Sequence, residues 1–201
     1  MTSASAAWVL IPVKAPGAGK TRLAALLSAA ERESLVEAML EHVVDMARAQ
    51  VARIVIIGPE RRGLAARLER IEDAGGGLNA ALEHACRVIA LRSDAPDRLI
   101  VLPADLPCLV PEDVARLRDL GPGTVGIAPD RHGRGTNALS LPLPAVARFR
   151  FRFGPKSAAL HRREAEFLRL SVVTISTPGL AKDIDERCDL ADAAHMFSPA
   201  N

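Results

Sequence analysis

A loop rich in glycine and lysine near the start of the chain could bind phosphate. Gly-Ala-Gly-Lys-Thr at positions 17–21 follows an apolar run that ends near Val13. The phosphate loop of a nucleoside triphosphatase has the pattern G-x-x-x-x-G-K-[ST], whose first glycine lets backbone N–H groups wrap the phosphates. Here that first position holds Lys14. The constrained glycine is missing, but Lys14, Lys20 and Arg22 still predict a site for a polyanion.

An aspartate that follows a second apolar run could bind a metal ion. Asp105 lies in a turn between Pro103 and Pro107, which restrict the backbone and direct one carboxylate outward. Such a carboxylate suits Mg²⁺, which takes one or two protein oxygens together with substrate phosphates. The alternative is that Asp105 caps the helix beginning near Pro111. That helix has acidic residues of its own at its start, so we favour the metal role.

A second acidic pair lies near the C-terminus. Asp183 and Asp185 are two residues apart and share one side of an extended chain. Acidic pairs in loops are usually only solvated. This pair gains weight because a metal bound to a triphosphate needs a second carboxylate besides Asp105.

Two further segments could contact a nucleotide or another anion. Glycines 75–77 precede a helix, where backbone N–H groups are free to bind an anion, and the Asn79 amide could pair with a nucleobase edge. A flexible surface turn is the alternative. Gly154 and Ser157 lie at the start of another predicted helix that could receive an anion.

A polar loop at 130–137 could also bind a phosphate or a carboxylate. It carries Arg131, Arg134, Thr136 and Asn137, which offer guanidinium and other polar groups. His132 in the same loop could act as a general base, although a loop histidine is more often solvated than catalytic.

The bulk composition excludes several classes of protein. The 201 residues, 49% of them hydrophobic, predict a single domain that spans 1–201. A net charge of +2 without a basic block, and the absence of tyrosine, argue against nucleic-acid binding. Three cysteines without CxxC spacing favour a reducing, cytoplasmic location. No apolar run reaches the roughly 18 residues that a membrane span needs, so we expect no membrane partner.

Short β-rich runs alternate with helical patterns along the chain. Ser28 and Glu31 form a capping box for a helix over about 29–50, and further helices are expected from near 64, 78, 111 and 155. The expected strands are 8–13, 53–58, 98–103, 124–129, 137–141 and 171–176. This alternation predicts an α/β fold with a mostly parallel sheet covered on both faces. The polar segments follow the strands, so they should form one rim at the carboxyl ends.

Six segments together resemble the 2-phospholactate guanylyltransferase family of coenzyme F420 biosynthesis. They are IPVKAPGAGKTRLA, GGGLNAALEHA, LPADLPCL, APDRHGRGTNAL, FRFGPKSAALH and GLAKDIDERCDL, in matching order from about Val9 to Leu190. The resemblance implies a single-domain α/β/α sandwich with a mixed, mostly parallel sheet, of the nucleotide-diphospho-sugar transferase, glycosyltransferase-A-like type. It implies transfer of GMP from GTP to 2-phospholactate, phosphoenolpyruvate or 3-phosphoglycerate with release of pyrophosphate, by a monomer or a homodimer.

The resemblance also implies roles for individual residues. Nucleotide contacts fall on Lys14, Lys20, Arg22, Gly77, Asn79 and Pro103, with Lys14, Lys20 and Asp105 as catalytic residues. Contacts to the acid substrate fall on Thr136, Asn137, Gly154 and Ser157. Mg²⁺ would be held by Asp105, Asp183 and Asp185.

Two positions depart from the family pattern, and two other functions compete with it. Lys156 stands where a small residue, often glycine, is usual, and DERCDL at 185–190 replaces the usual DTPxDL. The second departure leaves open which of Asp183 and Asp185 is the metal ligand. The competing functions are a phosphate-loop kinase or triphosphatase that uses Lys20 and Thr21, and a nucleotide-binding module without catalysis.

Overall fold

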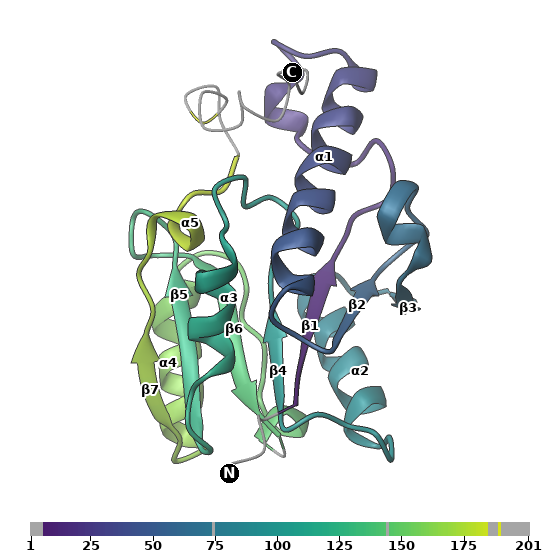
Figure 1. Cartoon of the computed structure of the whole chain (residues 1–201). Coiled ribbons are helices and arrows are strands. Elements are labelled where there is room, and N and C mark those ends of the chain that lie inside the picture. The colour runs from purple at the N-terminus through teal and green to yellow at the C-terminus, as the bar shows by residue number, and fades with distance from the viewer. Residues whose placement is uncertain (1–5, 74, 144, 185–188, 190–201) are drawn as a thin grey trace.

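A seven-stranded mixed sheet forms the centre of the molecule (Figure 1). The computed structural model describes residues 6–73, 75–143, 145–184 and 189. The strand order across the sheet is β3-β2-β1-β4-β6-β5-β7. The strands are β1 (Ala7–Pro12), β2 (Arg53–Ile57), β3 (Glu69–Ile71), β4 (Arg98–Val101), β5 (Thr124–Pro129), β6 (Thr136–Pro142) and β7 (Ser171–Thr174).

One strand of this sheet runs against the others. β6 is antiparallel to both β4 and β5, whereas the remaining pairings are parallel. The ends of β1, β2, β4 and β5 therefore share one edge with the start of β6. We call this edge, at the top of Figure 1, the carboxyl edge. The predicted rim of polar segments lies along it, as expected for a ligand site in such a sheet.

Helices cover both faces of the sheet. α1, α3 and α5 pack on one face, and α2 and α4 pack on the other. The α-helices are α1 (Ala29–Arg48), α2 (Leu78–Ala90), α3 (Pro111–Arg118), α4 (Ser157–Phe167) and α5 (Pro178–Ala181). Three short 3₁₀ helices are η1 (Thr21–Leu23), η2 (Gly63–Arg67) and η3 (Ala145–Ala147).

Alternating side chains of β1 supply both halves of the core. Val9 and Ile11 lie in the cluster under α1 and α3, whereas Trp8 and Leu10 lie in the cluster under α2 and α4. All four side chains are buried. Burying an aliphatic side chain of this size stabilises the fold by about 1.5–3 kcal/mol, so both helical layers are fixed to the same strand.

The sequence predicted most of these elements. Each of the six expected strands is present, and α1 starts at the predicted capping box, in which Ser28 and Glu31 exchange hydrogen bonds. The helix expected from near Leu64 is only the 3₁₀ turn η2. β3 and α5 were not predicted. No helix among the described residues is long and apolar enough to cross a membrane.

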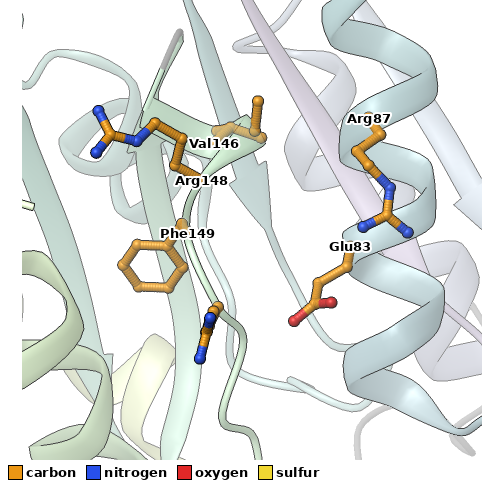
Figure 2. Close-up of a pocket in the computed structure, with 7 residues that line it drawn as sticks. Glu83, Arg87, Val146, Arg148 and Phe149 are labelled. Atoms are coloured by element: carbon orange, nitrogen blue, oxygen red, sulfur yellow. The ribbon is translucent and has the colours of Figure 1, made fainter.

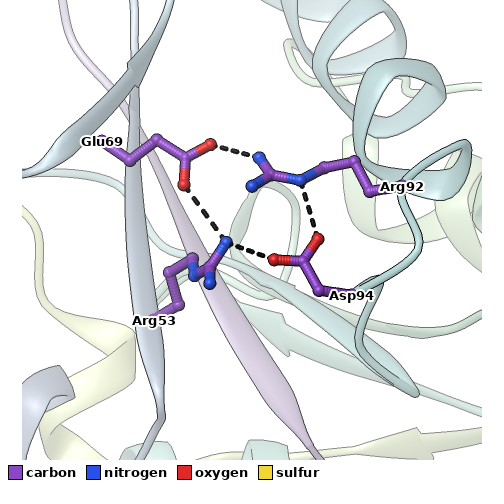
Figure 3. Close-up of polar contacts among 4 residues, drawn as sticks. All are labelled: Arg53, Glu69, Arg92 and Asp94. Atoms are coloured by element: carbon purple, nitrogen blue, oxygen red, sulfur yellow. Dashed lines mark hydrogen bonds and ion pairs between the residues drawn. The ribbon is translucent and has the colours of Figure 1, made fainter.

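Four charged side chains form a closed ring of ion pairs at the end of the sheet opposite the carboxyl edge (Figure 3). Arg53 and Arg92 each contact both Glu69 and Asp94, with 2.8 Å between Arg53 and Asp94 and 3.0 Å between Arg92 and Asp94. Both guanidinium groups also lie over the Trp8 ring, 4.2 and 5.0 Å from its centroid. This ring joins the short edge strand β3 to the rest of the sheet and lies away from the carboxyl edge.

Candidate active site

Lys20 joins three segments that are far apart in the sequence. Its Nζ atom lies 2.5 Å from Oδ2 of Asp105 and donates a second hydrogen bond to the carbonyl oxygen of Ile184. The Lys20 side chain is only 7% exposed. The first loop, the turn after β4 and the C-terminal acidic segment therefore meet at one ammonium group.

Packing explains why the C-terminal segment lies there. Ile184 is buried against Leu23, Leu35 and Met39, a small cluster formed by η1 and α1. This contact holds the backbone beside Asp183 at the carboxyl edge. Asp185, the other predicted metal ligand, lies outside the described residues.

The donor set at Lys20 suits a hard cation. A carboxylate of Asp105 and a backbone carbonyl already surround a positive charge, and oxygen donors of this kind are the ligands that Mg²⁺ prefers. Among the described residues, no group of three His, Cys, Asp or Glu side chains could hold a metal by itself. The fit is therefore to an ion that takes one or two protein oxygens and completes its shell with phosphates and water.

The alternative role of Asp105, as a helix cap, is filled by another residue. Asp113 accepts a hydrogen bond from the Val110 backbone N–H at the start of α3, with a length of 3.1 Å. Asp105 is instead bonded to Lys20.

Arg61, which the sequence did not indicate as a site residue, positions the first loop. The Arg61 side chain is 2% exposed. Its guanidinium lies 2.9 Å from carboxylate oxygens of Glu33 and Glu37 on α1 and donates to the Lys14 carbonyl oxygen at 3.2 Å. Glu33 also accepts the Gly17 N–H at 2.8 Å. The available signal was a pair of glutamates one turn apart on α1, with an arginine just after β2.

Burial also affects the acid groups of this network. Loss of solvent raises the pKa of the Glu37 carboxyl above its usual value, although the nearby charge of Arg61 acts in the opposite direction. The buried arginine and its two half-buried glutamates therefore form a charged network under the loop.

Four other predicted nucleotide contacts lie around the same edge. Lys14 and Arg22 are exposed in the first loop, and Pro103 is half-buried directly after β4. Gly77 is the residue before α2 and has φ 84°, a backbone conformation that glycine adopts readily. Their contacts to a nucleotide stay a prediction.

Asn79 has a partner in the chain itself. Its Oδ1 accepts the N–H of Phe153 at 2.8 Å, and its Nδ2 donates to the carbonyl oxygen of the same residue at 3.1 Å. Both ends of the amide are thus bonded to the segment that leads to Gly154. The suggestion that Asn79 pairs with a nucleobase stays a prediction, and the contacts described here assign it a positioning role.

The predicted acid-binding residues gather around the start of β6 and of α4. β6 runs antiparallel to β4, with Leu139 paired to Val101, so Thr136 at the start of β6 lies at the same edge of the sheet as the turn that carries Asp105. Thr136 Oγ1 lies 3.0 Å from Nδ1 of His161 on α4. Ser157 is buried at the first position of α4, one helical turn before His161.

Asn137 and Asp130 hold the neighbouring segments in place. Asn137 Nδ2 donates to the Leu180 carbonyl oxygen at 2.9 Å, which ties β6 to α5. Asp130 accepts hydrogen bonds from the backbone N–H groups of His132, Arg134 and Gly135. Burial alone would raise the pKa of Asp130, but these three bonds outweigh it and lower the pKa below its usual value.

Comparison with known proteins identifies the family of this chain. Residues 7–196 match the family described as "Guanylyl transferase CofC like". The chain belongs to this family.

Guanylyltransferases with three different named substrates are similar to the chain. A phosphoenolpyruvate guanylyltransferase from Chloroflexus aurantiacus is 41% identical over 89% of this chain and 89% of its own length. A 3-phospho-D-glycerate guanylyltransferase from Phenylobacterium zucineum is 33% identical, covering 92% and 88%. A 2-phospho-L-lactate guanylyltransferase from Methanothermobacter thermautotrophicus is 35% identical, covering 91% and 82%.

Solved structures support the expected fold type. A crystal structure assigned as a nucleotide-diphospho-sugar transferase from Desulfovibrio desulfuricans G20 matches with a TM-score of 0.72 at 18% identity, over 92% of this chain and 85% of that one. A 4-diphosphocytidyl-2C-methyl-D-erythritol synthase matches with a TM-score of 0.65 at 15% identity, over 96% and 99%. At such identities the likeness concerns the fold alone.

The guanylyltransferase fold differs from a phosphate-loop fold at Lys20. In a phosphate loop, the lysine opens an α-helix whose N–H groups face the phosphates. Here Lys20 has φ 52° and precedes only the three-residue 3₁₀ turn η1. Its ammonium group is directed to Asp105. The first loop of this guanylyltransferase family member is therefore built differently, despite its Gly-Lys-Thr sequence.

Two cavities among the described residues are lined by none of the predicted site residues. Figure 2 shows one of about 170 Å³, between α2 and the segment that starts at η3. Glu83 and Arg87 line it from α2, and Arg148 from the facing segment. A larger cavity lies between α3 and β7. Neither is lined by a predicted site residue, so the candidate site rests on the contacts around Lys20 and Thr136.

Proposed function

We propose that this protein transfers GMP from GTP to a phosphorylated three-carbon acid and releases pyrophosphate, as a step in coenzyme F420 biosynthesis. One observation supports this most: Lys20 of the cationic first loop contacts both the Asp105 carboxylate and the Ile184 carbonyl oxygen. These oxygens are of the kind that bind a cation. The names of the relatives offer phosphoenolpyruvate, 3-phosphoglycerate and 2-phospholactate as acids. The family context and the cysteine usage favour a cytoplasmic location.

In this proposal the chain provides positioning and charge neutralisation. The acceptor phosphate has a second pKa near ~6, so at neutral pH it is a nucleophile without a protein base. One of its oxygens bonds to the α-phosphorus of GTP while the bond from that phosphorus to the oxygen of the departing pyrophosphate breaks. Lys14, Lys20 and Arg22 neutralise the charge on the triphosphate and on the leaving pyrophosphate.

We also propose that Asp105, with Asp183 or Asp185, holds Mg²⁺. When bound, this ion would supply charge neutralisation between the α-phosphate and the incoming phosphate. Lys20 contacts Asp105 in the structure, so its ammonium group would lie near an ion held by that carboxylate.

Product analysis tests this function. The protein is incubated with GTP, Mg²⁺ and each of the three acids in turn, and the mixtures are examined by mass spectrometry. We expect a guanylated diphosphate of one acid and an equal amount of pyrophosphate, both lost when EDTA replaces Mg²⁺. Formation of GDP and inorganic phosphate would instead support a triphosphatase, and GTP binding without any product would support a binding module.

A further inference from the structure

His161 is a buried titratable group that the proposed reaction does not use. It is 0% exposed and lies on α4, with its ring 4.9 Å from that of Phe153. Nε2 accepts the backbone N–H of Arg152 at 2.9 Å, and Nδ1 lies 3.0 Å from Thr136 Oγ1. One imidazole thus connects the segment before Gly154 to the start of β6.

These contacts fix which ring nitrogen carries the proton. A backbone N–H can only donate, so Nε2 must offer its lone pair to Arg152. Burial lowers the pKa of His161 to about 4, so the ring is neutral at physiological pH. The single ring proton is therefore on Nδ1, and it is donated to Thr136 Oγ1.

The direction of this hydrogen bond decides what Thr136 can do. A hydroxyl that accepts a hydrogen bond from His161 keeps its own hydrogen for another partner. Thr136 lies at the carboxyl edge with 9% of its surface exposed, and the turn that carries Asp105 lies at the same edge. We propose that His161 is a positioning residue that turns the Thr136 hydroxyl into a hydrogen-bond donor for an anionic oxygen of the acid substrate. This inference rests on the proposed function for the identity of that anion.

Two substitutions of His161 test the roles of its two ring nitrogens separately. His161→Asn places an amide near the Nδ1 position and can still donate to Thr136. His161→Gln places an amide oxygen near the Nε2 position and can still accept from Arg152, but it loses the donor to Thr136. Thr136→Val removes the hydroxyl itself, and Thr136→Ser keeps it. Ser140→Ala, which removes a buried hydroxyl farther along β6, controls for lost stability.

Steady-state kinetics with GTP and the acid substrate provide the first test. We expect the acid KM to rise at least about tenfold in His161→Gln and Thr136→Val, with the GTP KM within twofold of wild type. His161→Asn and Thr136→Ser should stay within about threefold, and Ser140→Ala should change neither KM. The double variant His161→Gln, Thr136→Val should match Thr136→Val, because both remove one hydroxyl donor. Multiplied effects, or equal rises in both KM values, would overturn the proposal.

The second test needs no turnover. Nitrogen-15 NMR of the histidine rings in the full wild-type chain, assigned by comparison with His161→Asn, should show a neutral Nδ1–H tautomer for His161 from pH 5 to 8. An Nε2–H tautomer, or an imidazolium at pH 6, would overturn the proposal. If the wild-type chain makes no guanylated product, the proposed function and the acid-binding role fail together. Normal turnover with an unchanged acid KM in both His161→Gln and Thr136→Val refutes this inference alone.

Discussion

Lys20 shows how one side chain can bring distant segments of the chain together. Its ammonium group holds Asp105 and the Ile184 carbonyl at the position where the family resemblance expects a metal ion. A lysine carries three donors on a flexible stem, so it can leave these oxygens for a phosphate when another cation neutralises them. The residue that made the first loop look like a phosphate loop thus acts through a different geometry.

Lys156 is the residue at which the chain departs from the family and adopts a costly backbone conformation. It has φ 60° and precedes α4, in the left-handed region that favours glycine. We expect Lys156→Gly to raise the free energy of unfolding by about 1 kcal/mol, because the left-handed backbone conformation costs a non-glycine residue about that amount. The melting temperature should rise by about 2–4 °C in a chain of this size.

Calorimetry on matched variants measures this effect. Arg163→Gly, in the exposed middle of α4, should lower stability by about 1 kcal/mol, because glycine is unfavourable inside a helix. If Lys156→Gly also lowers the melting temperature, Lys156 makes a favourable contact that outweighs its strain.

Individual side-chain roles were the part of the site that the sequence predicted least completely. Asp105 and Lys20 could be predicted as site residues because a carboxylate and an ammonium group each support few kinds of chemistry. The Asn79 amide could not be assigned, since its partner is the backbone of Phe153, 74 residues away. The role of His161 could not be assigned from the sequence for the same reason, because Thr136 and Arg152 reach it only in the folded chain.

At the scale of elements, the first loop depends on α1 and on the end of β2. The guanidinium of Arg61 contacts two glutamates of α1 and the Lys14 carbonyl oxygen at the same time. Its planar group offers several donors in fixed directions, which the single ammonium group of a lysine cannot reproduce. We expect Arg61→Lys to raise the KM for GTP about fivefold to tenfold, because the loop loses its support, while the KM for the acid substrate stays within twofold. Steady-state kinetics with each substrate varied in turn provide the measurement.

The neighbouring arginine supplies the control for this variant. Arg62 is exposed, so Arg62→Lys should leave both KM values unchanged. A GTP KM that is unaltered in Arg61→Lys, or altered equally in the two variants, would show that the buried network does not position the loop.

The elements missed by the sequence analysis are those with little local signal. β3 has three residues, Glu69–Ile71, and its pairing with β2 is reinforced by the ion-pair ring of Figure 3. α5 has four residues and is fixed by the Thr177 cap and by the Asn137 contact to Leu180. Long periodic segments such as α1 need no such tertiary support to be recognised.

At the scale of the whole molecule, the buried His161 couples stability to pH. Its pKa is about 4 in the folded chain against 6.5 for an exposed histidine. Between pH 4 and pH 6.5, the His161 ring therefore binds a proton in the unfolded chain but not in the folded chain. The contribution of His161 is complete above pH 6.5 and is lost as the pH falls toward 4, by about 3 kcal/mol from 1.36 kcal/mol per pKa unit.

Denaturant unfolding of wild type and His161→Asn at pH 6.5 and 4 isolates this contribution. Between these pH values the wild-type chain should lose about 3 kcal/mol more than the variant, since both retain the carboxylates with lowered pKa, such as Asp130. Equal losses in the two proteins would mean that His161 is protonated in the folded state above pH 4.

The overall fold was predictable from alternating strands and helices, and the gathering of the polar segments at one edge from the way such strands run in parallel. The reversed direction of β6 was not predicted in detail. It matters because it brings Thr136, at the beginning of a strand, to the same edge as Asp105, which follows the end of another. One antiparallel strand thus places the two proposed substrate regions at the same edge of the sheet.

The most direct test of the account is the turnover of Asp105→Asn, measured as pyrophosphate release from GTP and the acid substrate with Mg²⁺. An amide of the same size is a poor ligand for Mg²⁺ and a weaker partner for Lys20. The account predicts a loss of at least about 100-fold in kcat, or about 2.7 kcal/mol in the barrier, with circular dichroism like that of wild type. A well-folded Asp105→Asn protein with wild-type turnover would contradict it.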